Sequence, residues 1–263
     1  MRFLLLLFSF PLFAAYVGNP ASPAIMNIGF FSGPSPFFKF TSGYLADYTS
    51  NKRFSRENKT DVDPGQTFHE FGIHSQMATV SAIFVERFEL FGAAGGSKEH
   101  TKWDRTPTYK DFSTILTDFE SSYTFSWAAG AKVILIQWWQ TYLSADFTYF
   151  DIPSSHQSYF KFLNRLNLTL EPEKQTFSMH EWQVSLGLST RIFILTPYGG
   201  ATYLHSKLNI HSGADVPPLY YENKENFGFF YGLTLSLTGR FHLNFERRVR
   251  DEFAYSLAAI AVF

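Results

Sequence analysis

The chain has 263 residues, of which 19% are aromatic and only 17% are charged, and it contains no cysteine. This composition excludes an intrinsically disordered chain, a disulfide scaffold, a thiolate metal site and cysteine catalysis. The net charge of −1 at pH 7 argues against a general nucleic-acid binder.

The first 15 residues predict a secretory signal peptide. Arg2 precedes an almost unbroken apolar run from Phe3 to Phe13, and cleavage is expected after Ala15, although Phe13 departs from the usual small residue at the −3 position. The alternative is a membrane anchor, but the run is shorter than the roughly 20 residues that a spanning helix needs. No apolar run of that length follows, so a membrane location requires a β-barrel.

Residues 16–36 form a segment ahead of the first predicted strand, expected in the periplasm or in the lumen of the barrel. Its second part, from Ile25 to Pro36, carries Ile28, Phe30 and Phe31. This part either folds into the lumen as a constriction or runs along the periplasmic rim, and the sequence favours neither placement.

Apolar and polar residues alternate with a period of two in several long segments. Between Trp182 and Ile194 the even positions are mostly apolar and the odd positions mostly small or polar. The same alternation occurs near 123–135, 227–238, 241–246 and 253–263. A helix would repeat every 3.6 residues, so these segments are predicted to be strands with one apolar and one polar face.

Strand length separates two β architectures. The strands of a soluble β-sandwich also alternate but average about five or six residues, whereas a membrane-crossing strand needs about nine to eleven. Several segments here reach eleven residues or more. Aromatic residues gather near segment ends, as in membrane girdles, at Trp138-Trp139, Tyr149-Phe150, Tyr220-Tyr221, Phe253 and Tyr255. We therefore predict an all-β fold, a transmembrane antiparallel β-barrel over 37–263.

The barrel is predicted to have about ten strands, with eight to twelve left open. They are placed near 37–48, 68–84, 88–97, 121–135, 139–150, 180–194, 197–210, 227–238, 240–247 and 253–263. Short turns are expected at Glu86-Arg87, Gln137-Trp138, Leu195-Thr196 and Gly239, and longer connections at 49–67, 98–120, 151–179 and 211–226. Short periplasmic turns, long extracellular loops and an even strand count place both termini in the periplasm, as in bacterial outer-membrane barrels.

Two segments leave the strand pattern open. In 68–84, Phe71 and Ile73 have one parity and Val80 has the other, which a β-bulge would reconcile. The connection 151–179 is long enough for a further hairpin through Phe160 to Leu170, which would give twelve strands.

The last strand carries an expected assembly signal. The chain ends in Phe263, and apolar or aromatic residues occupy every second position before it, beginning with Phe253 and Tyr255. A terminal Phe on an alternating strand resembles the signal by which bacterial outer-membrane proteins are assembled. We assign that role to Tyr255 and Phe263.

Five stretches carry a family resemblance from one end of the chain to the other. They are Tyr16-Val-Gly-Asn-Pro-Ala-Ser-Pro-Ala24, Glu86-Arg-Phe-Glu-Leu-Phe-Gly-Ala-Ala-Gly-Gly96, Phe125-Ser-Trp-Ala-Ala-Gly-Ala-Lys132, His180-Glu-Trp-Gln-Val-Ser-Leu-Gly-Leu-Ser-Thr-Arg191 followed by Thr196-Pro-Tyr-Gly-Gly200, and Arg248-Val-Arg-Asp-Glu-Phe253 through Phe263. In this order they resemble the chlamydial major outer membrane porin family. The resemblance implies porin activity and a structural role in the envelope.

The chain departs from that family in two respects. Family members are rich in cysteine and form a disulfide network, which a cysteine-free chain cannot join. The chain is also shorter than the usual member, and barrels with fewer strands are narrower and tend to fill with side chains.

Ionisable residues opposite the apolar faces are predicted to line the pore: Lys39, Asp47, Arg87, Glu89, Lys132, Asp146, Glu181, Arg191, Arg240, His242 and Glu246. Five are basic, five are acidic and one is histidine, so the lining is nearly balanced and weak ion selectivity is expected. The alternative is that the opposite charges pair and close the lumen.

No catalytic motif is complete. Gly92-Ala-Ala-Gly-Gly-Ser-Lys98 lacks the spacing of a phosphate-binding loop, and His69 and His74 lack metal-ligand spacing. His205, His211, Asp215 and Glu222 would lie near an outer rim, but no motif gives them a catalytic geometry. We expect no enzymatic activity, no metal and no cofactor.

The sequence supports three hypotheses in order of preference. The first is an outer-membrane porin for passive diffusion of small hydrophilic solutes and ions. The second is a non-conducting structural or adhesive barrel that acts through its extracellular loops, and the third is an outer-membrane hydrolase. The expected partners are outer-membrane lipid and lipopolysaccharide, the barrel assembly machinery and small solutes; homo-oligomer formation is left open.

Overall fold

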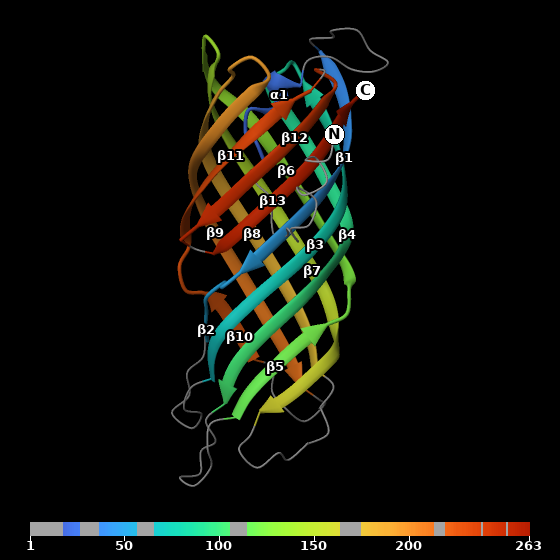
Figure 1. Ribbon diagram of the computed structural model, residues 1–263, viewed down its shortest axis with the longest axis vertical. Helices are drawn as coiled ribbons and strands as arrows, with labels where there is room; N and C mark the ends of the chain where they lie inside the picture. Colours follow the sequence, from blue (N-terminus) through green and yellow to red (C-terminus); the bar gives the residue numbers. More distant parts are fainter. Residues whose placement is uncertain are drawn as a thin grey trace, which may run out of the picture.

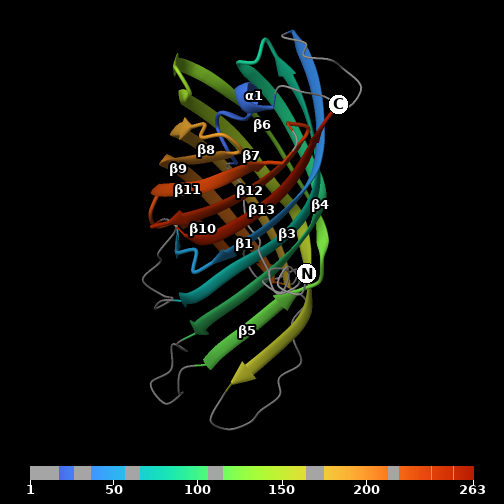
Figure 2. The same ribbon diagram turned by 45° about the horizontal axis from the view of Figure 1, so that its top comes forward.

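The computed structural model describes residues 18–26, 37–56, 66–105, 115–163, 175–212, 219–237, 239–250 and 252–263. These residues form one antiparallel sheet that closes on itself into a tall barrel (Figure 1). Figure 2 shows a short helix inside one mouth of the barrel. The all-β prediction of an antiparallel barrel is therefore confirmed.

The elements are listed here with their bounds: α1 (Ser22–Ile25), β1 (Phe38–Ser50), β2 (Phe54–Arg56), β3 (Gln66–Phe84), β4 (Phe88–Arg105), β5 (Ile115–Ser121), β6 (Thr124–Trp138), β7 (Thr141–Leu163), β8 (Gln175–Thr190), β9 (Leu195–Ser212), β10 (Leu219–Asn223), β11 (Phe227–Ser236), β12 (Phe241–Val249) and β13 (Phe253–Val262). Within the described ranges, no helix is long and apolar enough to cross a membrane.

Ten of these strands form the closed wall. Each pairs antiparallel with the next in the order β1, β3, β4, β6, β7, β8, β9, β11, β12 and β13. The first and last strands then pair with each other, from Thr41 opposite Val262 to Ser50 opposite Phe253. The predicted count of ten strands is correct, and closure leaves the membrane-crossing wall without an edge.

The two ends of the barrel differ in their connections. Short turns at 85–87, 139–140, 191–194 and 237–240 lie at the end that also carries the start of β1 and the end of β13, which is the upper end in Figure 1. Two turns lie a few residues from their predicted places, because β6 continues to Trp138 and β8 ends already at Thr190. Following the outer-membrane pattern, the short-turn end is periplasmic.

The wall continues well beyond the membrane on the extracellular side. β7 has 23 residues, which corresponds to about 75 Å along the strand, whereas a crossing needs only about nine to eleven residues. β5 and β10 continue the lines of β6 and β11 in this region, and β2 pairs with β10. β12 and β13 are short, so the outer wall follows the order β3, β4, β5, β7, β8, β9, β10 and β2.

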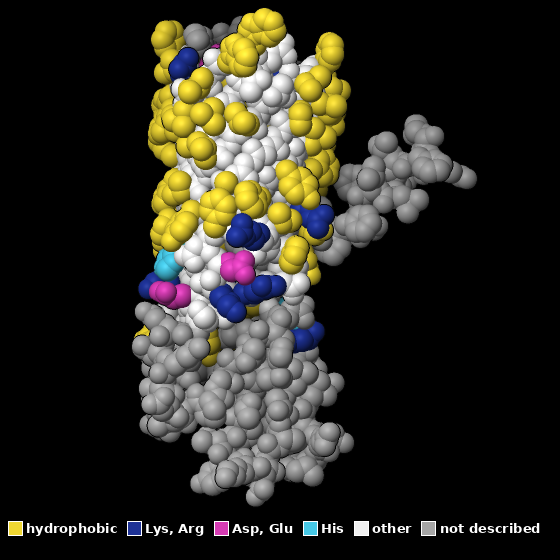
Figure 3. All heavy atoms as spheres, turned by 90° about the vertical axis from the view of Figure 1, so that its left-hand side faces the viewer, with side chains coloured by type: hydrophobic (Ala, Val, Ile, Leu, Met, Phe, Trp, Pro, Cys, Tyr) yellow, Lys and Arg dark blue, Asp and Glu magenta, His cyan; other side chains and the backbone are white. Residues whose placement is uncertain are grey.

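The outward face of the membrane-spanning wall is apolar. Its exposed side chains include Leu135, Phe147, Leu186, Leu188 and Phe245, each between 46% and 56% exposed. On the face seen in Figure 3, groups of hydrophobic side chains cover this part of the wall, and Lys, Arg, Asp and Glu gather beyond them toward the extracellular end. A water-soluble protein rarely exposes an apolar surface of this extent, whereas lipid covers it in a membrane.

The inward face of β3 keeps one parity from Phe71 to Ile83, which corrects the predicted bulge. In β3, Phe71, Ile73, Ser75, Met77, Ser81 and Ile83 are all buried, so the parity does not change within 71–83. The register shift of β3 lies at Phe68 and Glu70 instead. Phe71 and Ile73 do not belong to the lipid-facing surface because they fill the outer lumen.

The proposed extra hairpin is also absent from the part of the chain that the structure describes. Residues 160–163 extend β7, and β8 begins at Gln175. Residues 164–174 lie outside the described residues. Two residues of the predicted girdles, Phe150 and Tyr221, are 3% and 1% exposed and belong to the interior.

Candidate functional site: the filled lumen

A segment from the N-terminal region fills the periplasmic mouth of the barrel. We call residues 18–26 the plug; it contains α1 and lies inside the wall (Figure 2). Asn19, Ala21, Ser22, Ile25 and Met26 are at most 2% exposed. The lumenal placement that the sequence left open therefore applies to 18–26, whereas 27–36, with Ile28, Phe30 and Phe31, lie outside the described residues.

Polar contacts hold the plug on several strands. Asn19 Nδ2 donates to Thr234 Oγ1 at 2.8 Å, and Asn19 Oδ1 accepts from Ser189 Oγ at 2.9 Å. Lys132 Nζ donates to the Asn19 carbonyl oxygen at 3.5 Å, and Ser22 donates to Glu89. These contacts reach β11, β8, β6 and β4, so the plug is fixed from several sides of the wall.

Apolar packing and a glycine complete the seat of the plug. Ala21, Ile25 and Met26 form a cluster with Ile83, Ile134, Tyr142 and Val262. A Cβ atom at Gly187 would lie 2.8 Å from Pro20 Cγ and 2.9 Å from Phe230 Cζ. Pro20 therefore approaches the wall at a place where only glycine leaves enough room.

A small cavity lies on the extracellular side of the plug. Its volume is about 60 Å³, and its polar lining includes Thr41, Ser75, Glu89, Lys132 and Asn244. This volume corresponds to roughly four or five water molecules. The plug residue Ser22 and the buried residue Phe150 both contribute to its wall.

Above the cavity, a chain of buried ionic contacts crosses the lumen. Arg248 is fully buried and contacts three carboxylates: Glu252 at 2.8 Å from Nε, Glu246 at 3.3 Å from Nη1 and Asp47 at 3.5 Å from Nη2. Ser256 Oγ donates to the same Asp47 oxygen at 2.7 Å. These contacts join β12, β13 and β1.

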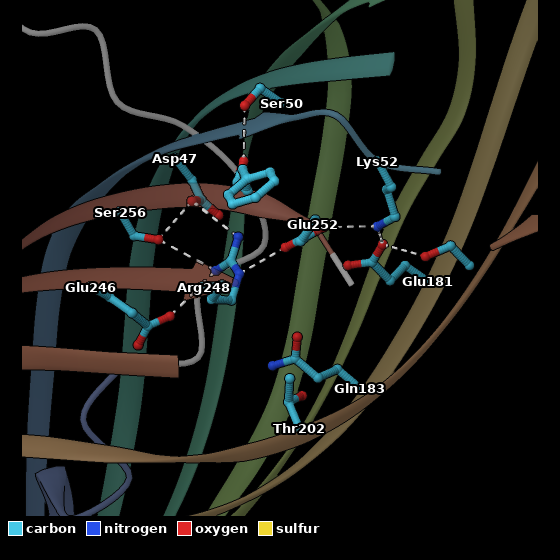
Figure 4. A network of polar contacts seen from close by, with 12 residues as sticks. Asp47, Ser50, Lys52, Glu181, Gln183, Thr202, Glu246, Arg248, Glu252 and Ser256 are labelled. Carbon is cyan, nitrogen blue, oxygen red and sulfur yellow. Dashed lines mark hydrogen bonds and ion pairs between the residues drawn. The ribbon is translucent and has the colours of Figure 1, made fainter. Parts of the chain in front are cut away.

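Lys52 continues this chain to the opposite wall. Its ammonium group lies 3.2 Å from Glu252 and also contacts Glu181 of β8. Ser206 of β9 donates to Glu181 at 2.6 Å. Figure 4 shows Glu252 between Arg248 and Lys52, so the contacts extend from β1 to β9 across the barrel. We call these residues the ionic bridge: Asp47, Lys52, Glu181, Ser206, Glu246, Arg248, Glu252 and Ser256.

The extracellular part of the lumen is packed like the interior of a soluble protein. A cluster of buried apolar side chains, which we call the outer core, contains Leu45, Phe54, Phe71, Ile73, Met77, Ala93, Phe150, Ile152, Phe177, Met179, Leu208, Ile210, Tyr221 and Ala258. Phe54 of β2 packs edge-on against Phe71 with ring centroids 4.9 Å apart. The outer core explains why the wall stays closed beyond the membrane.

Three successive layers thus occupy the lumen between its two mouths. The plug closes the periplasmic mouth, the ionic bridge joins opposite walls, and the outer core extends from the cavity into the extracellular part. Within the described part of the chain, the lumen between the plug and the outer core contains this small cavity.

Eight of the eleven residues predicted to line the pore have buried side chains inside the barrel, at most 6% exposed. They are Lys39, Asp47, Glu89, Lys132, Asp146, Glu181, His242 and Glu246. The structure brings Asp47, Glu181 and Glu246 together in the ionic bridge, and Glu89 and Lys132 at the plug. That these residues line a conducting pore stays a prediction.

The remaining three predicted residues lie outside the lumen. Arg87, Arg191 and Arg240 belong to periplasmic turns, because β4 begins at Phe88, β8 ends at Thr190 and β12 begins at Phe241. Arg87 and Arg240 are exposed to solvent. The alternation continued through these positions in the sequence, but the chain already reverses there.

Several residues of the filled lumen carried no recognisable signal in the sequence. Lys52, Arg248 and Glu252 lay in segments predicted to be connections, and Asn19 lay ahead of the barrel. Arg248 has the same parity as Glu246, so extending the predicted strand by one residue would have found it. Lys52 lies after the end of β1, next to Asn51, which has a positive φ of 56°. The strand alternation therefore ends before Lys52 and does not predict where the Lys52 side chain lies.

The outer rim residues do not form a common site. His205 Nε2 lies 4.0 Å from Glu222, which pairs with Lys207 at 2.8 Å, while Asp215 lies outside the described residues. The hydrogen bond from Lys207 lowers the pKa of the Glu222 carboxyl below its ordinary value. No group of three or more His, Asp or Glu side chains within the described part of the chain is arranged to hold a metal.

The assembly-signal residues lie on the outward face of the last strand. Tyr255 is 39% exposed and Phe263 is 36% exposed. Phe263 N donates to the carbonyl oxygen of Phe40 at 2.8 Å, next to the seam where β13 meets β1. Their assigned role in assembly stays a prediction.

Closure of ten antiparallel strands, an apolar outward band and short turns at one end define the class. The chain is a bacterial outer-membrane β-barrel protein.

Comparison with known proteins identifies no family for this chain. No protein-family model matches the chain, and no curated protein does. Among solved structures, the outer membrane protease OmpT from Escherichia coli is 9% identical, with 86% of this chain and 93% of that chain covered and a TM-score of 0.42. The toluene transporter TbuX from Ralstonia pickettii is 8% identical, with 93% and 91% covered and a TM-score of 0.40. The translocator domain of NalP from Neisseria meningitidis is 10% identical, with 86% and 88% covered and a TM-score of 0.42.

Proposed function

We propose that this protein is a non-conducting outer-membrane barrel with a structural role in the envelope, and that it acts through its extracellular wall and loops. The ionic bridge is the observation that carries the proposal, because it joins β1 to β9 across the lumen through fully desolvated contacts. The plug closes the periplasmic side of the bridge, and the outer core adds a third closure.

The energetic cost of opening supports this proposal. Breaking a buried ion pair by removing one partner costs about 3–5 kcal/mol, and the bridge contains several such pairs. The outer core adds buried aromatic side chains, each worth about 1.5–3 kcal/mol when it is kept from water. A continuous water path therefore requires disruption of both regions. The proposal assigns no catalytic activity to the chain.

Single-channel recording in a planar bilayer tests the proposal. The refolded protein, checked for heat-modifiable migration, is expected to give no regular conductance steps. The positive control is a variant that lacks 16–36 and carries Arg248→Ser, which removes the plug and the centre of the bridge. The matched control carries Arg240→Ser, an exposed arginine in a periplasmic turn. Regular ohmic steps from the unaltered protein would overturn the proposal.

A porin for small hydrophilic solutes is the second candidate. The favouring observation is the polarity of the interior: eight of the predicted pore-lining ionisable side chains are buried there, together with Lys52, Arg248 and Glu252, where apolar residues of similar size would close the lumen at lower cost. The resemblance to the chlamydial porin family points in the same direction. On this hypothesis the plug leaves its seat and the bridge is hydrated in an open state. Liposome swelling with small sugars is expected to be slow for the unaltered protein and fast after deletion of 16–36; equal rates would exclude plug release.

A further inference from the structure

Two arginines lie on the outward surface where the apolar band ends on the extracellular side. Arg247 of β12 stands in register between Tyr231 of β11 and Tyr255 of β13. Its guanidinium carbon lies 5.2 Å from the centroid of the Tyr255 ring. Arg250 follows β12 and is exposed, and its guanidinium carbon lies 5.9 Å from the ring centroids of both Phe227 and Phe229. Aromatic rings thus hold both cations at the membrane boundary.

The hydrogen-bonding capacity of Arg247 is left unused. Its Nε atom is buried, and among the described residues it has no hydrogen-bond partner. Neighbouring charges on this side include Arg53, whose Nη1 lies 3.3 Å from Glu225, and the exposed Lys224. Figure 3 shows Lys and Arg side chains, with Asp or Glu side chains among them, beyond the hydrophobic side chains on one side of the barrel. The surface is therefore predominantly cationic where it leaves the lipid.

An apolar groove begins beside Arg247 and faces the membrane. Its volume is about 310 Å³, and its outward-facing lining consists of Tyr231, Leu233, Phe245, Arg247 and Tyr255. Tyr231, Phe245 and Tyr255 are 49%, 47% and 39% exposed, so the groove is open to lipid rather than to the lumen. A cation at the outer end of an apolar groove matches a molecule with an anionic head and an acyl chain.

We propose that Arg247 and Arg250 bind the phosphate of a phosphorylated outer-leaflet lipid, with an acyl chain of that lipid in the groove. The planar guanidinium groups of Arg247 and Arg250 match phosphate in a bidentate geometry. The low dielectric of the membrane boundary strengthens such an ion pair relative to one in water. The groove selects a lipid over free phosphate, because only a lipid also fills the apolar surface.

Binding is measured by native mass spectrometry of the refolded protein in detergent micelles. The probe is lipid A that carries two phosphates, titrated beside the same lipid A after enzymatic removal of both phosphates. Phosphatidylglycerol tests whether one lipid phosphate is sufficient, and excess inorganic phosphate tests whether the free anion competes. We expect the phosphorylated lipid A to bind at least tenfold more tightly than its dephosphorylated form, and inorganic phosphate not to displace it.

The variants separate the proposed site from a general cationic surface. Arg247→Gln with Arg250→Gln is expected to weaken binding of phosphorylated lipid A about tenfold and to leave the dephosphorylated form unchanged. Arg247→Lys keeps the charge but loses the bidentate fork, so an intermediate loss is expected. Arg53→Gln removes a nearby exposed arginine and is the matched control, with less than a twofold effect.

Folding of each variant is checked by heat-modifiable migration. If the double variant fails to fold, Arg250→Gln alone tests the site, because Arg250 lies outside the strands. Equal binding of the two lipid A forms, or an unchanged affinity of the double variant, would overturn the proposal. Lipid binding is measured independently of conductance. If the protein conducts but binds phosphorylated lipid A as expected, the proposed function is contradicted and the lipid site is not.

Discussion

The two halves of the lumen are closed by different means. On the periplasmic side the closing element is a short segment that belongs to no strand, held by side-chain hydrogen bonds and a small apolar cluster. On the extracellular side the closing groups are borne by the wall and its connecting segments, as the ionic bridge and the outer core. The plug contributes no strand to the wall, whereas most groups of the second closure are carried by the wall's own strands.

The largest effect is expected in the outer core. Phe177 is completely buried, and Phe177→Ala removes its ring and leaves a cavity, which is expected to cost about 4 kcal/mol of unfolding free energy. Urea titration of the refolded protein in micelles measures this loss. The matched control is Phe193→Ala, because Phe193 is 90% exposed in a periplasmic turn and should change stability by less than about 0.5 kcal/mol. Similar losses for the two variants would show that the outer core does not stabilise the barrel.

The ionic bridge should give the next largest effect. Arg248→Met keeps much of the side-chain volume but leaves Asp47, Glu246 and Glu252 around an apolar group. The expected loss is about 3 kcal/mol in the same titration, because the carboxylates lose their common partner. Adding Asp47→Asn to this variant removes one of the unpaired charges and should restore part of the loss. A double variant no more stable than Arg248→Met would contradict the pairing.

Weakening the contacts of the plug is expected to loosen the plug while the stability of the barrel wall stays unchanged. Asn19→Ala removes the side-chain bonds to Thr234 and Ser189 and is expected to weaken docking of the plug by about 1–2 kcal/mol. Hydrogen exchange of residues 18–26 should then be about tenfold faster or more, while urea unfolding of the barrel stays unchanged. Ser50→Ala, which removes a hydroxyl bond to the Phe253 carbonyl on the other side of the barrel, is the control. Joint loss of plug protection and wall stability would show that the two closures are coupled.

The smallest effect is expected from an ion pair on the outer surface. Lys207 lowers the pKa of the Glu222 carboxyl, so the pair stabilises the folded state above the ordinary glutamate pKa of about 4.3. This contribution disappears as the pH falls through the lowered pKa. Because the Glu222 side chain is 33% exposed and the Lys207 side chain 48% exposed, water screens the pair and Glu222→Gln should cost only a few tenths of a kcal/mol at pH 7.

The pH dependence provides the check for this pair. The stability difference between Glu222→Gln and the unaltered protein should shrink as the pH falls from the ordinary glutamate pKa through the lowered pKa of Glu222, because the carboxylate becomes protonated in both folded and unfolded states. Glu120, whose carboxyl pKa is lowered by a hydrogen bond from Lys98, serves as an independent pair on another part of the outer surface. A difference that persists unchanged to low pH would show that Glu222 acts through packing rather than charge.

Much of the barrel could be predicted because lipid imposes a strict alternation on its strands. Trp182 to Ile194 showed the period of two, and β8 covers most of that segment. The residues of the lumen were harder to predict. Inward-facing positions alternate with lipid-facing ones, but they can be either polar or apolar, so an apolar inward residue is easily taken for a lipid-facing one. Phe71 and Ile73 therefore suggested a bulge, when they belong to the outer core.

The interior residues also depend on contacts between distant parts of the chain. Arg248 meets Asp47 across 201 positions, and Asn19 meets Thr234 across 215. A single sequence carries no sign of such pairs, since each residue is an ordinary polar residue in its own segment. The plug and the ionic bridge appear only when the barrel closes and brings β1 beside β13.

The amino-acid sequence by itself determined the class of fold, the ten strands, the membrane-facing surface and the difference between short and long connections. These features follow from local periodicity, because each strand must present apolar side chains to lipid and pair its backbone with its neighbours. Only the tertiary structure decided that the lumen is filled, since filling depends on barrel diameter and on which distant side chains meet inside. The aromatic-rich, charge-poor and cysteine-free composition thus specifies the wall, while a few buried polar residues from distant segments close it.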